Sequence, residues 1–253
     1  MKADFGKTAS DYQKHRAGFP DSFFSRLQNE GLIEGSETLV DVGSGTGTVA
    51  RGLAKIGCQV TAIDPSSEML GAALGMAKEE GVVIDCLQGT AEETGLKDHC
   101  ADVVTAGQCW HWFDPESAFK EVRRILKPGG LLLIAHFDWL PIHGNVVLHT
   151  EKLIMEKNPS WNMGGQVGVY PEWFRHLNEG GFSDICSFSY QETVNYSHEA
   201  WLGRIRASAG VVGSLSEEEV VAFDEAHKQM LEIHFPEDLL SIPHQVFFIH
   251  GRK

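Results

Sequence analysis

The first half of the chain alternates between short apolar runs and segments in which apolar residues recur every three or four positions. The apolar runs predict buried strands at 38–42, 58–63, 82–87, 101–106 and 131–137. The segments between them predict amphipathic helices at 48–56, 68–80 and 115–126. Because strands that are apolar throughout are buried on both faces, this alternation predicts a parallel sheet with helices on either side.

The two ends of the chain follow a different pattern. Residues 5–30 place aromatic and aliphatic side chains at helical spacing around a break at Gly18-Phe19-Pro20, which predicts two short helices. Residues 138–170, rich in Trp, His, Asn and Gly, resemble a lid insertion, and further strands are expected near 185–192 and 245–250. We therefore expect three parts: a helical cap at 1–35, a ligand-binding core at 36–137, and at 138–253 a lid, the last two strands and a helical cap that complete the same domain.

Size and charge narrow the class of protein. The 253 residues are enough for one large α/β domain. The formal net charge is −14, from 21 Lys and Arg against 35 Asp and Glu, and no basic run marks a surface for nucleic acid. Neither a signal peptide nor a long apolar span is evident, so we expect a cytoplasmic protein that does not enter a membrane. The five cysteines form no C-x-x-C pair, which argues against structural metal sites and disulfide bonds. Nothing in the sequence specifies an oligomeric state.

A glycine-rich turn follows the first predicted strand. Gly43, Gly45 and Gly47 occupy alternate positions directly before the predicted helix at 48–56. Glycine allows positive φ and lets a ligand approach where a Cβ atom would collide. The helix that follows directs unpaired N–H groups and the positive end of its dipole towards the turn. This stretch therefore predicts a binding site for a nucleotide-like ligand.

Two acidic residues and one threonine narrow the choice of ligand. The dinucleotide pattern G-x-G-x-x-G would require glycine at position 48, where this chain has Thr48. Asp41, directly before the turn, suits a ligand that carries an ammonium group together with a carboxylate. Asp64, at the predicted end of the second strand, can accept hydrogen bonds from both hydroxyls of a ribose, as in NAD and S-adenosylmethionine sites. An Asp before Pro is also a common turn residue, so Asp64 alone does not decide between these readings.

Four motifs together resemble those of class I S-adenosylmethionine-dependent methyltransferases. In chain order they are Asp41-Val-Gly-Ser-Gly-Thr-Gly47, Asp64-Pro-Ser-Ser-Glu-Met69, Gly89-Thr-Ala-Glu92 and Arg124-Ile-Leu-Lys-Pro-Gly-Gly130. The resemblance covers about residues 36–137. It implies a doubly wound, Rossmann-like α/β fold whose seven-stranded, mostly parallel sheet has the order 3-2-1-4-5-7-6, with the last strand antiparallel.

Two further motifs resemble one branch of this superfamily. Gln108 with His111-Trp112-Phe113, and the N-terminal Tyr12-x-x-x-Arg16, are similar to the small-molecule branch that includes trans-aconitate methyltransferase-like (methyltransferase type 11) proteins.

The resemblance also implies S-adenosyl-L-methionine as the cofactor and a set of residues that bind it. Gly43 and Gly45 would line the methionine part, Asp64 would bind the ribose, and Met69 or Ser66 would pack near the adenine. Thr90 with Ala91 would meet the adenine edge, although the family often has Asp at the position of Thr90. The full expected set is Tyr12, Arg16, Asp41, Gly43, Ser44, Gly45, Asp64, Pro65, Ser66, Met69, Thr90, Ala91, Glu92, Gly107 and Gln108.

The aromatic loop after the fourth predicted strand offers candidates for the chemistry. Methyl transfer from a sulfonium is an in-line displacement, for which a protein mainly aligns the reactants and excludes water. A carboxylate acceptor needs no general base, whereas a phenol or amine does, and His111 is the nearest candidate; its alternative role is packing that shapes the pocket. Trp110, Trp112 and Phe113 either form an apolar wall beside the sulfonium and acceptor or simply pack in the core or lid.

The C-terminal part holds further candidates for acceptor binding. Arg204 and Arg206 lie between the last two predicted strands, where a guanidinium, in particular that of Arg206, could clamp a carboxylate. Alternatively, the two arginines lie on a solvent-exposed helix face and pair with nearby Glu side chains. Trp161, in a Gly-rich segment, is a candidate substrate contact.

The sequence therefore favours a methyltransferase that uses S-adenosyl-L-methionine, needs no metal and acts on a small molecule. Methylation of a carboxylate oxygen is the specific hypothesis for the acceptor. An NAD-dependent oxidoreductase, which Thr48 argues against, and a cofactor-binding protein without catalysis are the alternatives.

Overall fold

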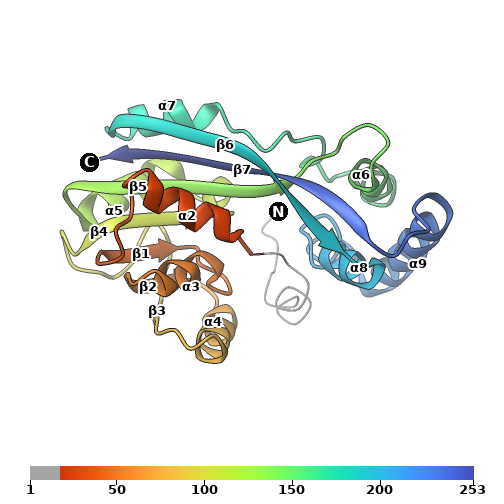
Figure 1. Ribbon diagram of the computed structural model, residues 1–253, viewed down its shortest axis with the longest axis horizontal. Helices are drawn as coiled ribbons and strands as arrows, with labels where there is room; N and C mark the ends of the chain where they lie inside the picture. The colour runs from red at the N-terminus through yellow and green to blue at the C-terminus, as the bar shows by residue number, and fades with distance from the viewer. Residues whose placement is uncertain (1–17) are drawn as a thin grey trace. The chain divides into compact units, whose positions relative to one another are not determined.

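The computed structural model describes residues 18–253, which form two compact units. The sheet unit contains 18–137, 170–190 and 246–253, and the helical unit contains 138–169 and 191–245 (Figure 1). The first expected helix, with Tyr12 and Arg16, lies outside the described residues. The expected binding core at 36–137 lies entirely in the sheet unit, whereas 138–253 contributes to both units.

Seven strands form one sheet in the order β3-β2-β1-β4-β5-β7-β6, which confirms the expected topology. The pairs β1–β2, β1–β4, β2–β3 and β4–β5 are parallel. The arrows of β6 and β7 point in opposite directions in Figure 1, so the sheet is mixed at this end. The strands are β1 Thr38–Val42, β2 Gln59–Asp64, β3 Asp85–Gln88, β4 Ala101–Gly107, β5 Leu126–Trp139, β6 Ser183–Tyr196 and β7 Leu240–Arg252.

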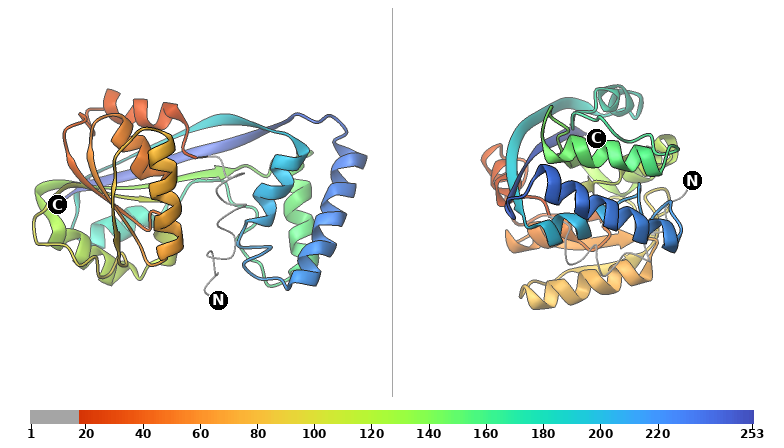
Figure 2. Two further views of the ribbon diagram at one scale, coloured as in Figure 1. Left: turned by 90° about the horizontal axis from the view of Figure 1, so that it is seen from below. Right: turned by 90° about the vertical axis from the view of Figure 1, so that its right-hand side faces the viewer.

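Helices cover both faces of the sheet (Figure 2). On one face lie α2 Asp21–Asn29, α3 Thr48–Lys55 and α4 Ser67–Glu79. The close approach of α2 to α3 requires Gly52, because a Cβ atom there would lie 2.0 Å from the Phe24 ring. On the other face α5 Pro115–Ile125 and α7 Glu172–Glu179 bury apolar side chains against β4, β5 and β7. Burial on both faces is the reason that these strands are apolar throughout.

β6 and β7 begin two and five residues before the predicted positions 185 and 245, and β3 and β5 also differ from the prediction at their beginnings. β3 begins at Asp85, three residues later than expected, and Val83 is 86% exposed, because residue 82 is still hydrogen-bonded to the end of α4. β5 begins at Leu126 and includes the predicted turn 127–130. Leu126 pairs with Ala101 and Leu131 with Val103, so the turn is a bulge within one strand.

The helical unit packs α6 Val146–Lys157, α8 His198–Arg206 and α9 Glu217–His234 around an apolar core. Trp201 and Phe223 are fully buried at its centre. The Trp201 indole N–H donates to Thr150 Oγ1 at 3.1 Å, and this hydroxyl is 3.2 Å from His227 Nε2. No helix between residues 18 and 253 combines the length and the apolar character needed to cross a bilayer.

The fully buried His227 makes the helical unit sensitive to acid. Burial, with smaller contributions from Arg206 and His198, lowers the pKa of His227 to about 3. An imidazole in an unfolded chain titrates near pH 6.5. Below that pH the unfolded chain therefore binds a proton that the folded unit does not bind. The folded unit with its neutral His227 is therefore most stable relative to the unfolded chain above pH 6.5, and it loses this stability as the pH falls towards 3.

We predict that His227→Leu reduces this sensitivity. Between pH 6.5 and 4.5 the free energy of unfolding should decrease as the pH is lowered, and more steeply in the wild type than in the variant. The two slopes should differ by about 1.4 kcal/mol per pH unit. Urea unfolding at a series of pH values measures the two slopes. His143→Gln, at an exposed histidine of the same unit, is the control and should keep the wild-type slope. Equal slopes for the wild type and His227→Leu would contradict the prediction.

Candidate functional site

The glycine turn between β1 and α3 presents one open position. Gly43, Gly45 and Gly47 all have positive φ, at 62°, 55° and 74°. A Cβ atom on Gly43 would lie 2.9 Å from Cys109 Sγ, and one on Gly47 would lie 3.1 Å from a side-chain atom of α4. A Cβ atom on Gly45 would meet no atom within 4 Å. Gly45 therefore marks the side of the turn on which a ligand can approach the backbone.

Asp41 lies beneath this turn and does not line it. Its side chain is only 1% exposed, and its carboxylate accepts a hydrogen bond from Thr105 Oγ1 at 2.7 Å. Burial raises the pKa of Asp41 to about 7, against the opposing effect of hydrogen bonds from Thr105 and the Ala50 backbone. The expected contact between Asp41 and a ligand ammonium is therefore not direct, because this carboxylate joins β1 to β4 and to the first turn of α3.

Asp64 connects the end of β2 to the turn. Gly45 N donates to Oδ2 at 2.8 Å, and Ser66 N donates to Oδ1 at 2.9 Å. Burial raises the pKa of Asp64, while these two backbone hydrogen bonds lower it. Each carboxylate oxygen still has a lone pair for a second donor. Asp64 thus lies beside the open glycine with acceptor capacity left for a ligand hydroxyl.

Polar groups near the turn also suit a ligand. The α3 helix begins after Gly47, which provides no side-chain cap, so its first N–H groups are directed towards the turn. The Ser44 hydroxyl is buried and has no hydrogen-bond partner among residues 18–253. A buried hydroxyl of this kind normally has a partner, and a polar ligand would supply one.

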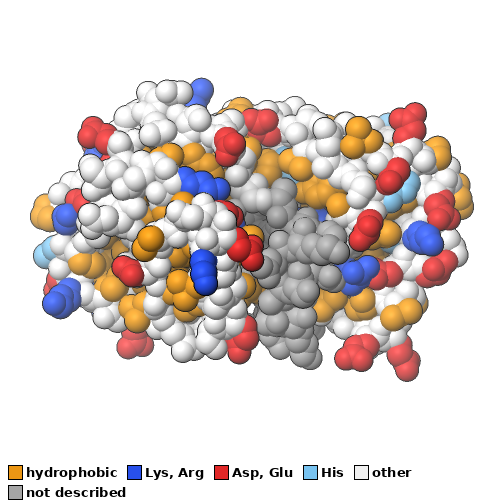
Figure 3. Space-filling model, turned by 60° about the horizontal axis from the view of Figure 1, so that its bottom comes forward, with side chains coloured by type: hydrophobic (Ala, Val, Ile, Leu, Met, Phe, Trp, Pro, Cys, Tyr) orange, Lys and Arg blue, Asp and Glu red, His pale blue; other side chains and the backbone are white. Residues whose placement is uncertain are grey.

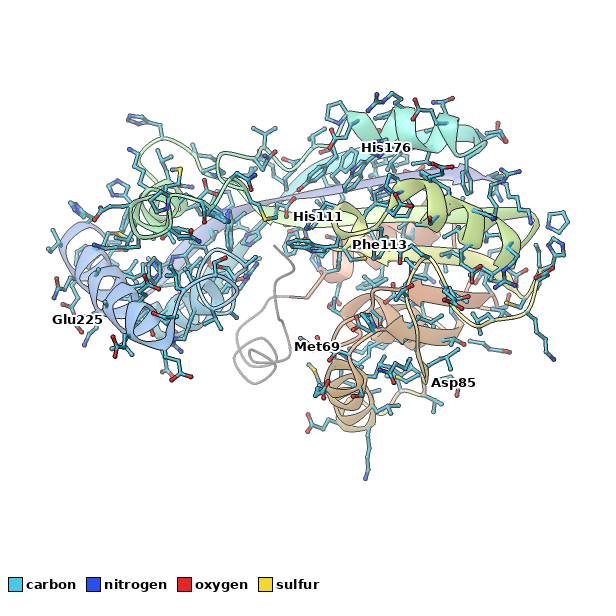
Figure 4. The ribbon with its side chains drawn as sticks, turned by 180° about the vertical axis from the view of Figure 1, so that it is seen from behind. Met69, Asp85, His111, Phe113, His176 and Glu225 are labelled. Atoms are coloured by element: carbon cyan, nitrogen blue, oxygen red, sulfur yellow. The ribbon has the colours of Figure 1, made fainter. Side chains whose placement is uncertain are left out.

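The beginning of α4 lies next to Asp64. Ser66 caps this helix, accepting from Met69 N at 3.2 Å, while Pro65 is exposed. Met69 is buried, so its contact with an adenine would be limited to the edge of its side chain. In Figure 4, Met69, His111 and Phe113 lie towards one edge of the sheet unit, whereas Asp85, at the beginning of β3, lies away from it.

The loop after β3 contains one expected contact that the structure does not expose. Ala91 is 1% exposed and packs in the core of the sheet unit, which does not support the expected contact of its side chain with the adenine edge. Thr90 is exposed, and its hydroxyl accepts from Glu93 N at 3.1 Å. Glu92 Oε1 accepts from Asp114 N at 3.0 Å, which ties this loop to the beginning of α5.

The aromatic loop after β4 is fastened to β5. Gln108 has a positive φ of 64°, its N–H donates to Ala135 O at 2.9 Å, and its side-chain amide donates to Phe137 O. Strained backbone of this kind clusters at functional sites. A Cβ atom on Gly107 would lie 2.5 Å from Val49, so the packing of α3 against this strand requires glycine here.

The aromatic residues of this loop fall into two groups. Trp110 is 2% exposed and packs against Phe119, so its burial does not support the expected contact with substrate. His111 and Trp112 are exposed, with ring centroids 4.6 Å apart, and Phe113 is half-buried. The pair therefore lies at the surface of the sheet unit.

The candidates in the helical unit have partners within that unit. The Arg206 guanidinium pairs with Asp224 of α9 at 2.5 Å, which corresponds to the alternative of an acidic partner on a helix surface. Arg204 lies over the Trp139 ring, 4.6 Å from its centroid, and burial lowers its pKa. A Cβ atom on Gly210 would lie 3.0 Å from Trp161 Nε1, so Trp161 is a packing residue. These contacts do not support a carboxylate clamp.

Sequence reasoning missed a buried histidine beside the aromatic loop. His136, on β5, is 2% exposed, and its ring centroid is 5.2 Å from that of His111. It follows five consecutive apolar residues, and the only signal in the sequence is a histidine where a buried strand would have another apolar side chain. Among residues 18–253, no group of three His, Cys, Asp or Glu side chains could hold a metal ion.

The comparison with known proteins agrees with this geometry. Residues 40–134, from β1 to β5, match the family described as "Methyltransferase domain". Over these residues the chain is similar to methyltransferase domains. The four sequence motifs lie within the matched residues, and the sheet unit has the strand order expected from the resemblance.

The similarity to other proteins extends beyond residues 40–134. An uncharacterised methyltransferase of Mycobacterium tuberculosis is 38% identical over 132 residues, which are 52% of this chain and 51% of that protein, so the match spans about half of the relative's length. An uncharacterised methyltransferase of Schizosaccharomyces pombe is 29% identical over 90% of this chain and 86% of its own. The solved structure of a candidate type II methyltransferase from Anaeromyxobacter dehalogenans has a TM-score of 0.66 at 21% identity and covers 94% of this chain and 97% of its own.

We predict that alanine affects the glycines of the methyltransferase turn unequally. Gly43→Ala adds a side chain at 2.9 Å from Cys109 Sγ, whereas Gly45→Ala adds one in open space. Both substitutions cost about 1–2 kcal/mol for positive φ, and Gly43→Ala costs a further ~1–3 kcal/mol for overpacking. Denaturant unfolding measures the difference. Gly31→Ala, also at positive φ in open space, is the control and should match Gly45→Ala. Equal losses at positions 43 and 45 would be inconsistent with this account.

Proposed function

We propose that this protein transfers the methyl group of S-adenosyl-L-methionine to a small-molecule acceptor. The observation that carries the proposal is the position of Asp64, whose carboxylate is held by Gly45 N and Ser66 N beside the open side of the methyltransferase turn. Two further lone pairs on this carboxylate suit the two hydroxyls of a ribose. The buried Ser44 hydroxyl and the uncapped beginning of α3 suit the polar methionine part.

Methyl transfer asks little of protein side chains beyond alignment. The displacement is in-line, so the protein needs no nucleophile of its own. The exposed Trp112 and half-buried Phe113 offer aromatic faces that attract a sulfonium cation. Bound at the turn, the cofactor would supply the activated methyl group, and the aromatic loop would help to position the acceptor against it.

A small acceptor fits the surface better than nucleic acid does. On the face shown in Figure 3, Lys and Arg side chains occur singly or in small groups among acidic ones. The net charge of −14 repels a polyanion, and binding of a phosphate backbone depends on many basic contacts. A carboxylate as the methylated group is less well supported, because the guanidinium of Arg206 is paired with Asp224 and that of Arg204 lies on Trp139.

We predict that the protein binds S-adenosylmethionine in preference to NAD. Isothermal titration of the full chain with S-adenosylmethionine, S-adenosylhomocysteine, NAD and NADH measures the preference. An oxidoreductase would require close contact of a pyrophosphate with the beginning of α3, where Thr48 replaces the third glycine of the dinucleotide pattern. Tight binding of NAD without binding of S-adenosylmethionine would overturn the proposed function. Binding without methyl transfer to any acceptor would favour a non-catalytic cofactor-binding protein.

We also predict that Asp64→Ala weakens binding of S-adenosylmethionine by about 1–3 kcal/mol, which is about 5- to 150-fold in Kd. The loss includes unpaired ribose hydroxyls and a loosened turn, since Asp64 also holds Gly45. Asp64→Asn, which keeps one carbonyl oxygen as acceptor, should lose less. Asp85→Ala, at the exposed beginning of β3, is the control and should bind as the wild type does. Unchanged affinity in Asp64→Ala would contradict the ribose role.

A further inference from the structure

A buried histidine on β5 is enclosed by aromatic rings from three segments of the sheet unit. The ring centroid of His136 is 5.2 Å from His111 in the loop after β4, 4.6 Å from Tyr170 before α7, and 4.9 Å from Trp173 in α7. Tyr170 and Trp173 stack on each other at 4.2 Å with an interplanar angle of 6°. His136 is thus held in one place by rings that pack against it.

The loop that carries His111 is fixed to β5 on both sides of His136. Gln108 N donates to Ala135 O, and the Gln108 amide donates to Phe137 O, so the two acceptors flank His136 in the chain. His136 itself is 2% exposed, whereas His111 and the neighbouring Trp112 are exposed, Trp112 by 42%. The arrangement connects an imidazole inside the unit to one at its surface.

Packing alone does not require an imidazole at position 136. The strand before it is Leu131-Leu-Leu-Ile-Ala135, and a phenylalanine or leucine would continue this series without burying a polar ring. Burying a polar group costs free energy unless its polar atoms are engaged. The titratable groups among the rings around His136 are the His111 imidazole and the Tyr170 phenol.

We propose that His111 accepts the proton of an aromatic hydroxyl acceptor and that His136 is the positioning residue that holds His111 for this role. The proposal rests on the proposed function and specifies its acceptor. The exposed Trp112 ring, with its centroid 4.6 Å from that of His111, provides a face on which a planar aromatic acceptor can stack. Its hydroxyl then lies next to an imidazole, the side chain best suited to proton transfer near neutral pH.

The step balances without another reactant. The acceptor oxygen forms its bond to the methyl carbon while its proton moves to the His111 imidazole. The carbon–sulfur bond breaks, and its electron pair stays on the sulfur as S-adenosylhomocysteine forms. The imidazolium then returns the proton to solvent.

A pair of isomeric probes tests the acceptor class. Methyl 4-hydroxybenzoate offers only a phenol and 4-methoxybenzoate only a carboxylate, and methylation of either gives methyl 4-methoxybenzoate. With labelled S-adenosylmethionine and the full chain, we expect product from the phenol and little from the carboxylate. We expect His111→Ala to lower kcat for the phenol by about 100-fold or more. A preference for the carboxylate, or no product from the phenol by a protein that binds the cofactor, would overturn the proposal. A failure to bind the cofactor would instead overturn the proposed function.

The role of His136 requires a variant that keeps the packing. His136→Phe retains a ring of similar size, so we expect its affinity for S-adenosylmethionine and its KM to stay unchanged while kcat falls about 10-fold and the acidic limb of the pH profile moves. Nuclear magnetic resonance of 15N-labelled histidines provides a readout without turnover, in which the His111 titration midpoint should move in His136→Phe. His99→Gln, at the other end of β4, is the control and should leave this midpoint unchanged. A wild-type kcat and an unchanged His111 titration in His136→Phe would show that His136 only packs.

Discussion

The turn between β1 and α3 in the sheet unit depends on a buried carboxylate, that of Asp41. Asp41 joins β1 to β4 through Thr105 and to the first turn of α3 through the Ala50 backbone. Its burial is costly, as its raised pKa indicates, and the hydrogen bonds offset part of that cost. These hydrogen bonds hold the strand, the helix and the turn between them in one geometry. The polar groups beside the turn are then backbone N–H groups, the Ser44 hydroxyl and the second carboxylate, Asp64, which accepts a hydrogen bond from Gly45 N.

Much of this unit could be predicted from the sequence, because its signals are local. Apolar runs, glycines at alternate positions and the Lys127-Pro-Gly-Gly130 turn each restrict the backbone near them, and the resemblance supplied the strand order. Predictions failed where a distant contact decided the outcome. β3 starts late because the end of α4 occupies the backbone before it, and the turn at 127–130 became a bulge because both sides of it pair with β4.

The same distinction explains the outcome for individual site residues. Asp64 lies at the end of β2, as its place in the sequence predicted. Residue type and position assigned three other residues to ligands. In the structure, Trp110 packs against Phe119, Ala91 packs in the core of the sheet unit, and Arg206 pairs with Asp224. Those partners are 9 to 18 or more residues away in the chain, and no periodicity in the sequence reveals them. His136 was missed for the same reason, because it becomes a candidate site residue only through the rings that surround it, which come from distant parts of the chain.

The hydrogen bond from Asp114 N to Glu92 joins the loop expected at the adenine to the end of the aromatic loop. A cofactor that moves the loop after β3 would therefore also change the position of the aromatic loop, because the hydrogen bond joins the two. Such coupling is reciprocal, so the free energy by which bound cofactor favours the acceptor equals that by which bound acceptor favours the cofactor. In kinetic terms, this contact changes the affinities for the two ligands by the same factor and does not by itself determine which of them binds first.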